Sequence, residues 1–179
     1  MQINVYFVAL KIVLMQKAVF FDRDGVINRE IGNYVTQIKD FELLPDILEC
    51  FQLCKENGFL IIIITNQGGI DKALYNEKDL ESFHSVILNE CKKHDIQIED
   101  IYYCRHHPSV GNCLCRKPEP LMIQKAIAKH NIDKNKSFII GDNPRDIEAG
   151  EKAGIDGILI QPNSAKFRLI KEKIETFNQ

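Results

Sequence analysis

Two aspartates, Asp22 and Asp24, directly follow the apolar run Lys17–Phe21, and a third, Asp142, lies just beyond the run Ser137–Ile140. If both runs are parallel strands, their carboxyl ends meet at the edge where open α/β sheets bind ligands. Carboxylates gathered there would raise one another's pKa unless a hard divalent cation neutralised them. Mg²⁺ suits such a set, because it binds a few carboxylates and keeps water or phosphate in its remaining positions. A single Asp could simply cap the next loop, but three together favour a metal site.

Two further residues add to this set. Thr65 ends the apolar run Leu60–Thr65 and brings a hydroxyl group, and Lys117 supplies a positive charge ahead of a predicted helix. Arg23, between the first two aspartates, is expected to point away from the crevice, because alternate side chains of an extended segment face opposite sides.

A second group of candidate ligands lies in the segment 104–118, CRHHPSVGNCLCRKP. The spacing C-x-H-x6-C-x-C brings together Cys104, His106, Cys113 and Cys115. Thiolates and an imidazole in fourfold number suit a closed, structural Zn²⁺ site. Zinc would pin a loop of small and polar residues that runs directly into Arg116 and Lys117. His107 could replace His106 as the ligand, and chance clustering of free cysteines is the alternative that this spacing disfavours.

Length, composition and charge limit the classes of protein to which this chain can belong. The chain has 179 residues, 45% of them hydrophobic, with 23 basic and 25 acidic side chains and a net charge of −2. These values are typical of one globular domain. The charge provides no basic field for nucleic acid or an anionic membrane, so neither is expected as a partner. The six cysteines are not arranged like a secreted disulfide scaffold, which favours a reducing cytoplasm. We also expect a monomer.

The first sixteen residues are apolar but contain Lys11, and they have neither a basic leader nor a small-residue cleavage site. A membrane span needs about 20 apolar residues, so this segment is too short. Met15 stands two residues before the first predicted strand. We therefore expect residues 1–14 to be an N-terminal extension and residues 15–179 to be a single domain.

The elements that must position these residues alternate along the chain. Short continuous apolar runs predict buried strands at Lys17–Phe21, Leu60–Thr65, Ile98–Tyr103, Ser137–Ile140 and Gly157–Ile160. Apolar residues spaced near 3.6 predict helices at Pro45–Asn57, Glu77–His94, Pro120–His130, Arg145–Ala153 and Ala165–Phe177. Such alternation predicts an α/β fold: a parallel sheet covered by helices on both faces, in three Rossmann-like layers.

With these elements in place, four motifs resemble the signature of the haloacid dehalogenase (HAD) phosphatase superfamily. The motifs are DRDGV, a strand-terminal ITN, a lysine before a helix, and GDNPRD. They occur in the order of that superfamily and span residues 17–160. The resemblance implies a HAD-like parallel sheet and Mg²⁺-dependent phosphate ester hydrolysis through an aspartyl-phosphate.

The resemblance also implies roles for single residues. Asp22 would be the nucleophile, and Asp24 the acid and base that protonates the leaving alcohol and then activates water. Thr65 and the Asn66 amide would bind the phosphoryl oxygens. Lys117 would offset the charge that builds on those oxygens.

The ligands of Mg²⁺ would be the Asp22 side chain, the Asp24 backbone carbonyl and the Asp142 carboxylate. Asp146 would act through a neighbour, by holding Lys117 or a metal-bound water. Stabilisation of the helix dipole from the first turn is the alternative role for Asp146.

Further segments resemble two related families, the D-glycero-D-manno-heptose 1,7-bisphosphate 7-phosphatases and the histidinol-phosphatase domains. These segments are GNYVTQIKDFELLP, TNQGGI, and the zinc loop from IYYCRHHP to CRKP. The resemblance favours His106 over His107 as a zinc ligand, and removal of the 7-phosphate of the heptose bisphosphate as the reaction. Hydrolysis of histidinol phosphate is the alternative activity. Arg105 stands where the heptose family usually has proline.

The connections after the first two motifs are too short for a cap domain, so a capless phosphatase with an open site is expected. In a bisphosphate, the second phosphate needs a distant cation, and Arg116 is the candidate because guanidinium binds phosphate bidentately. An ion pair of Arg116 with Glu119 is the alternative. Gln67, Gly68 and Gly69 could offer backbone amides to the substrate, or could form a plain turn.

Other classes fit less well. Mutases and dehalogenases of the superfamily usually carry a cap, and a nucleic-acid 3′-phosphatase would need a basic surface. A non-catalytic zinc-binding interaction module would be expected to have lost the catalytic residues. All five are present: Asp22, Asp24, Thr65, Lys117 and Asp142.

Overall fold

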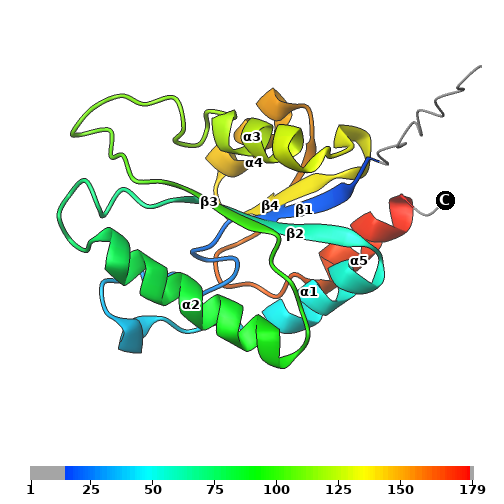
Figure 1. Cartoon of the computed structure of the whole chain (residues 1–179), viewed down its shortest axis with the longest axis horizontal. Coiled ribbons are helices and arrows are strands. Elements are labelled where there is room, and N and C mark those ends of the chain that lie inside the picture. The colour runs from blue at the N-terminus through cyan, green and yellow to red at the C-terminus, as the bar shows by residue number, and fades with distance from the viewer. Residues whose placement is uncertain (1–14, 178–179) are drawn as a thin grey trace, which may run out of the picture.

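Five parallel strands form one sheet in residues 15–177, the part of the chain that the computed structural model describes. The strands are β1 (Lys17–Phe21), β2 (Phe59–Asn66), β3 (Asp100–Cys104), β4 (Phe138–Gly141) and β5 (Asp156–Leu159). Their order in the sheet is β3-β2-β1-β4-β5 (Figure 1). The five predicted strands and their parallel arrangement are confirmed.

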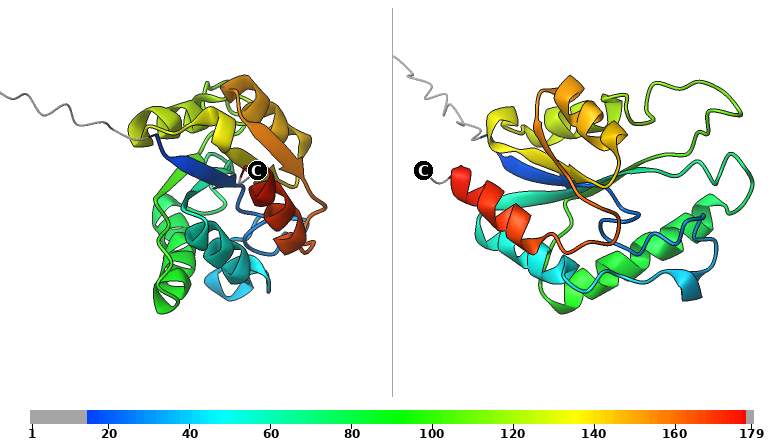
Figure 2. Two further views of the ribbon diagram at one scale, coloured as in Figure 1. Left: turned by 90° about the vertical axis from the view of Figure 1, so that its right-hand side faces the viewer. Right: turned by 180° about the vertical axis from the view of Figure 1, so that it is seen from behind.

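The helices lie on both faces of this sheet. They are α1 (Ile47–Glu56), α2 (Glu77–Lys93), α3 (Leu121–His130), α4 (Pro144–Ala153) and α5 (Phe167–Thr176), with short 3-10 turns η1 (Ile38–Asp40) and η2 (Lys134–Lys136). Helices α1, α2 and α5 cover one face, and α3 and α4 cover the other (Figure 2). The three-layer α/β architecture is confirmed.

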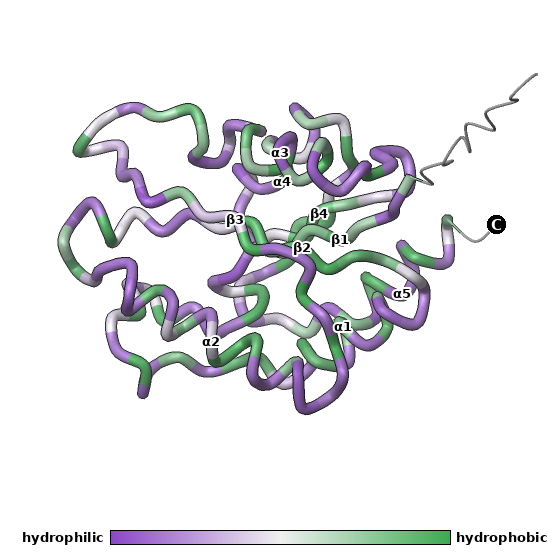
Figure 3. Tube along the Cα trace, viewed as in Figure 1, coloured by the Kyte–Doolittle hydropathy of each residue, from purple (hydrophilic) through white to green (hydrophobic). Residues whose placement is uncertain are grey.

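The strands are apolar along their length because both of their faces are covered. In β1, Val19 and Phe21 pack into the core beneath α1, α2 and α5, whereas Ala18 and Phe20 pack against α3 and α4. All four side chains are fully buried. Figure 3 shows the result as a hydrophobic centre, with hydrophilic segments on the outer helix faces and loops.

The loops at the carboxyl edge of the sheet are short. The segment between β1 and α1 holds only η1, and ten residues, 67–76, separate β2 from α2. Within residues 15–177, neither connection contains a cap domain, as predicted. The loop after β3 projects beside the β2 loop at the same edge (Figure 1). Residues 1–14, the predicted extension, lie outside the described part of the chain.

Among residues 15–177, no helix combines the length and the apolar character that a membrane crossing requires.

Candidate active site

The predicted polar residues meet in one cleft at the carboxyl edge of the sheet. The cleft has a volume of about 440 Å³, and its walls come from the segments that follow β1, β2, β4 and β5, together with Arg116. The predicted residues in its lining are Asp22, Asp24, Thr65, Asn66, Gln67, Arg116 and Asp142. Lys117 and Asp146 are buried beside Asp22. Parallel strands explain the convergence, because they end at a common edge.

Lys117 lies at the base of this cleft, with a side chain that is 1% exposed. Its ammonium group pairs with Asp22 Oδ1 at 2.8 Å and Asp146 Oδ1 at 2.7 Å, and donates to the Ile64 carbonyl at 2.7 Å. Three acceptors match the three protons of an ammonium group. Burial alone would lower the pKa of Lys117, but the charges of Asp22 and Asp146 raise it overall. The lysine therefore stays charged at neutral pH.

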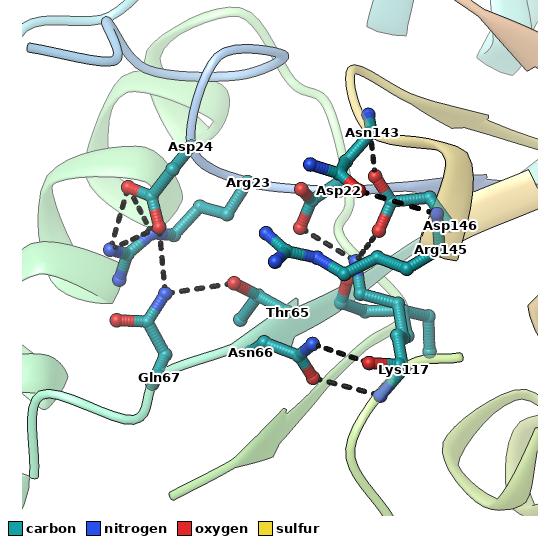
Figure 4. Close-up of polar contacts among 11 residues, drawn as sticks. Asp22, Arg23, Asp24, Thr65, Asn66, Gln67, Lys117, Asn143, Arg145 and Asp146 are labelled. Carbon is teal, nitrogen blue, oxygen red and sulfur yellow. Dashed lines mark hydrogen bonds and ion pairs between the residues drawn. The ribbon is translucent and has the colours of Figure 1, made fainter. Parts of the chain in front are cut away.

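Asn66, at the end of β2, fixes the backbone of this lysine. Its Nδ2 donates to the Lys117 carbonyl and its Oδ1 accepts from the Lys117 N–H, both at 3.0 Å (Figure 4). The side chain of Asn66 therefore lies against the lysine loop, and a contact between an Asn66 amide and a phosphoryl oxygen stays a prediction. The pair ties that loop to the strand that carries Thr65.

Asp146 is placed against Lys117, which is one of the two positions expected for it. The carboxylate also accepts from the Asn143 N–H at 3.0 Å, completing a capping box at the start of α4, so the local role is present too. Gly141 makes room for it, since any larger residue there would collide with the Asp146 side chain. The end of β4 and the start of α4 therefore fix this buried carboxylate.

Asp22 and Asp142 are two carboxylates of the cleft whose pKa values are raised. Burial raises the pKa of Asp22 to about 7, with Asp146 adding to the effect and Lys117 opposing it. Burial and Asp146 likewise raise the pKa of Asp142 to about 6. Oxygen atoms of Asp22, Asp142 and Asp146 all lie within 4.8 Å of one another. Such crowding of anions fits a divalent cation, which would favour their ionised forms.

The backbone beside Asp24 fits the same cation. Gly25 adopts a φ of +80°, and a side chain at this position would collide with the carboxylate of Asp142. The backbone that follows Asp24 therefore packs against Asp142. The side chains of Asp22 and Asp142, with the nearby Asp24 carbonyl, form a set of hard oxygen donors of the kind that Mg²⁺ prefers.

Arg23 differs from expectation and pairs with Asp24. The Arg23 side chain does not point away: it lines the cleft, is 2% exposed, and donates to Asp24 through Nη2 at 2.8 Å. Its guanidinium also lies over the rings of Phe41 and Phe83. Burial would raise the pKa of Asp24, but the Arg23 charge and hydrogen bonds from neighbouring side chains lower it overall. Asp24 is therefore held as a carboxylate.

Gln67 connects Asp24 to Thr65. Its Nε2 donates to Asp24 Oδ2 and to Thr65 Oγ1, both at 2.8 Å, and its Oε1 accepts from the Tyr75 hydroxyl at 2.6 Å. Its backbone N–H, which we expected to face substrate, donates to the Cys104 carbonyl at 2.7 Å. Because Thr65 Oγ1 already accepts from Gln67, its own proton remains to be donated. Sequence analysis missed Tyr75, and no pattern in the sequence marks it.

Arg116 reaches the cleft from the loop after β3. Its Nη1 donates to the His106 carbonyl at 2.9 Å, and the alternative pair with Glu119 is wrong, since Glu119 lies against Lys152 at 3.4 Å. A side chain at Gly68 would come within 3.1 Å of Arg116 Nη1, so the glycine makes room for the guanidinium. Gly69 passes close to the Tyr75 ring, and both glycines lie in a hydrogen-bonded turn, which is the alternative expected for them.

The second predicted cluster is also assembled. Cys104 Sγ lies 3.5 Å from Cys113 Sγ and 3.1 Å from Cys115 Sγ, and His106 Nδ1 lies 3.5 and 3.3 Å from Cys104 and Cys115. Ligands on a tetrahedral zinc ion, at about 2.0–2.3 Å from the metal, would be roughly 3.6–3.8 Å apart. The donor set therefore fits Zn²⁺. His107 is not in the cluster; its Nδ1 lies 2.7 Å from Ser109 Oγ.

The thiol protons bear on metal binding at this cluster. Burial, with hydrogen bonding from Cys115, raises the pKa of Cys104. A metal would have to displace that proton, since the thiolate is the ligand. All six cysteines of the chain are free thiols.

Known proteins with this fold define the class. The family described as HAD-hydrolase-like matches residues 114–173, a segment that contains Lys117, Asp142 and Asp146. The crystal structure of D,D-heptose 1,7-bisphosphate phosphatase from B. bronchiseptica, complexed with magnesium and phosphate, superposes with a TM-score of 0.77. The match has 26% identity and covers 88% of this chain and 87% of the other. The chain is thus a HAD-like hydrolase.

Two curated relatives show which family of HAD-like hydrolases the chain belongs to. The D-glycero-alpha-D-manno-heptose-1,7-bisphosphate 7-phosphatase of Photorhabdus laumondii is 41% identical over 145 residues, covering 78% of this chain and 79% of its own. The D-glycero-beta-D-manno-heptose-1,7-bisphosphate 7-phosphatase of Helicobacter pylori is 38% identical over 156 residues, covering 86% and 88%. The chain belongs to the D-glycero-D-manno-heptose-1,7-bisphosphate 7-phosphatase family.

Proposed function

We propose that this protein removes the 7-phosphate of D-glycero-D-manno-heptose 1,7-bisphosphate in a Mg²⁺-dependent reaction through an aspartyl-phosphate on Asp22. The observation that carries the proposal is the buried group of Lys117, Asp22 and Asp146 at the base of an open cleft. The names of the relatives favour the heptose bisphosphate over histidinol phosphate. A non-catalytic zinc module does not account for a catalytic set that is complete and assembled.

In the first step, an Asp22 carboxylate oxygen attacks phosphorus and the bond to the sugar oxygen breaks. Lys117 binds Oδ1 of Asp22 and so orients the carboxylate, leaving Oδ2 to attack. The Thr65 hydroxyl proton is available to a phosphoryl oxygen, because Gln67 occupies the acceptor side of Oγ1. Mg²⁺, held by Asp22, Asp142 and the Asp24 carbonyl, would supply charge neutralisation for the nucleophile and the phosphoryl group.

Asp24 would transfer the protons. As an acid it gives a proton to the departing sugar oxygen, and as a base it takes one from the water that attacks phosphorus and releases phosphate and Asp22. The carboxylate now pairs with Arg23 and Gln67. To act as an acid, Asp24 must therefore gain a proton and turn from Arg23 toward Asp22.

Arg116 would hold the second phosphate of the substrate. Its guanidinium lines the cleft on the side of the zinc loop and has donors beyond the one used on His106. Zn²⁺ at Cys104, His106, Cys113 and Cys115 would fix the segment that carries Arg116 and Lys117. Because zinc binding needs reduced thiols, we further propose that the protein is cytoplasmic. We also propose that it acts as a monomer and that residues 15–179 form one domain.

Phosphate release tests the proposal. Steady-state rates with Mg²⁺ and zinc-replete protein should give a much higher kcat/KM for the heptose 1,7-bisphosphate than for histidinol phosphate. Both anomers of the bisphosphate belong in the assay, because the relatives are named for either one. A preference for histidinol phosphate would overturn the substrate, and no phosphate release from either would overturn the hydrolase activity.

Arg116→Ala gives the sharper test of the second-phosphate site. The variant should raise KM for the bisphosphate far more than for a sugar monophosphate. Equal effects on the two substrates would mean that Arg116 does not contact the second phosphate.

A further inference from the structure

Among residues 15–177, Arg145 is the arginine of the cleft whose side chain has no hydrogen-bond or ion-pair partner. Three arginines line the cleft: Arg23, Arg116 and Arg145. Arg23 is paired with Asp24, and Arg116 donates to the His106 carbonyl. Within residues 15–177, the Arg145 side chain makes no hydrogen bond or ion pair, and its Nε is shielded from solvent without an acceptor. A buried donor without an acceptor is destabilising, because it has lost its hydrogen bonds to water.

Local structure does not explain an arginine at this position. Arg145 is in the first turn of α4, directly after the N-cap Asn143 and Pro144. The positive end of the helix dipole lies there, so a cation is disfavoured and an anion is favoured. The helix terminus and the guanidinium thus both present positive charge to the same cleft. An oxyanion would satisfy both.

The direction of the Arg145 side chain indicates which anion it would bind. Figure 4 shows Arg145 extending from α4 into the site, toward Asp22 and Thr65. Its charge acts on Asp142, which is one of the carboxylates that line the cleft. The guanidinium of Arg116 lies next to Gly68, which follows β2, so it approaches from the opposite side of β1. The two arginines therefore bracket the nucleophile, with Arg145 on the β4 side.

We propose that Arg145 binds the phosphoryl group that reacts at Asp22, whereas Arg116 binds the distant phosphate. This assignment deepens the proposed function and rests on it. The guanidinium of Arg145 offers two parallel N–H groups to the outward oxygens of the phosphoryl group, and the Thr65 hydroxyl at the end of β2 is available to the same group. Arg145 is therefore a substrate-contacting residue that sequence analysis missed, although it lies within the GDNPRD motif.

Kinetics of Arg145→Ala and Arg116→Ala test this division of roles. Loss of a charge-assisted hydrogen bond should lower kcat/KM of Arg145→Ala by about 10- to 100-fold. The loss should be the same for a sugar monophosphate as for the bisphosphate, because both place a phosphoryl group at Asp22. Arg145→Lys should recover part of it. The control Arg168→Ala removes an arginine that is 89% exposed on α5 and should behave as wild type.

Binding of inorganic phosphate gives a second readout that does not need turnover. Calorimetry on Mg²⁺-saturated protein should give a Kd for phosphate that Arg145→Ala raises about tenfold or more and Arg168→Ala leaves unchanged. Unchanged phosphate affinity and unchanged kinetics in Arg145→Ala would overturn the assignment. A loss confined to the bisphosphate would also overturn it, since Arg145 would then contact the second phosphate. If wild type bound phosphate but hydrolysed no substrate, the proposed function would fail while the phosphate site stood.

Discussion

The cleft and the cysteine loop are both built from loops at one edge of the sheet, yet different forces hold them. Around Asp22, buried ion pairs and hydrogen bonds link residues at the ends of β1, β2 and β4. The cysteine loop instead exposes Val110 at 63% and Leu114 at 77%, and buries few apolar side chains. Its ordering therefore has to come from the four ligands gathered at its base, which lie close enough to share one metal ion.

The two regions meet at a single segment. Cys115, Arg116 and Lys117 are consecutive, so the last residue of the Cys/His cluster is two residues from the buried lysine. From the other side, Asn66 ties the lysine backbone to β2. Lys117 therefore has one support from the sheet, through Asn66, and would have a second from the cysteine loop if the four ligands hold a metal ion. Single substitutions can therefore remove one support of Lys117, or remove a group proposed to react and leave both supports in place.

Asp22→Asn should have the largest effect on activity and spare the cysteine loop. The amide cannot attack phosphorus, so we expect kcat to fall at least ~10³-fold, as when a nucleophile is removed. Zinc content, measured by atomic absorption, and circular dichroism should match wild type. Asp40→Asn, an exposed change in η1, is the control and should stay active. Retained turnover in Asp22→Asn would refute the nucleophile.

Cys113→Ser should act first on the loop and only then on the cleft. Loss of a thiolate should reduce zinc content and lower the melting temperature together, because metal binding and ordering of the loop are coupled. We expect kcat to fall by roughly tenfold as Lys117 loses one support. Ser109→Ala, in the same loop but outside the four ligands, is the control. Unchanged zinc content would exclude Cys113 as a ligand.

The pH dependence of the free energy of unfolding should distinguish the cleft from the cysteine loop in the unmutated protein. For Asp22 and Asp142, the folded-state pKa values of about 7 and about 6 exceed the unfolded value near 3.8. The folded protein then binds more protons than the unfolded chain between about pH 4 and 7, so metal-free stability should fall as pH rises through this window.

Added Mg²⁺ should oppose that loss, because it favours the ionised carboxylates. Thermal melts should therefore show a larger Mg²⁺-induced rise in Tm at pH 8 than at pH 5. The rise should be much smaller in Asp142→Asn. A Mg²⁺ effect that is equal at both pH values would contradict the assignment of these carboxylates as the metal ligands.

Tyr75→Phe should produce the smallest change. The variant removes the 2.6 Å hydrogen bond to Gln67 Oε1 and frees the amide that bridges Asp24 and Thr65. We expect kcat to fall about 3- to 10-fold, with KM and zinc content little changed, since a net hydrogen bond contributes about 1 kcal/mol. A positioning role also predicts a shifted pH–rate profile, because Gln67 helps hold Asp24 ionised. An unaltered profile would leave Tyr75 with only a packing role.

The sequence by itself determined the alternation of strands and helices, the edge at which Asp22, Thr65 and Asp142 meet, and the spacing of the four candidate zinc ligands. These features follow from short-range rules: apolar periodicity, parallel strands that end at one edge, and ligand spacing within twelve residues. Lys117 was also predicted from the sequence, because one of the four motifs is a lysine before a helix.

Only the tertiary structure decided how the side chains between the motifs are used. Arg23 turns into the cleft because Phe41 and Phe83, from distant segments, form a surface for its guanidinium. The Asn66 side chain is hydrogen-bonded to the backbone of Lys117, 51 positions away. The guanidinium of Arg145 is unpaired because the described residues place no acceptor next to it. Hydrogen-bond partners of buried polar groups come from whatever the fold brings near, which local sequence patterns do not encode.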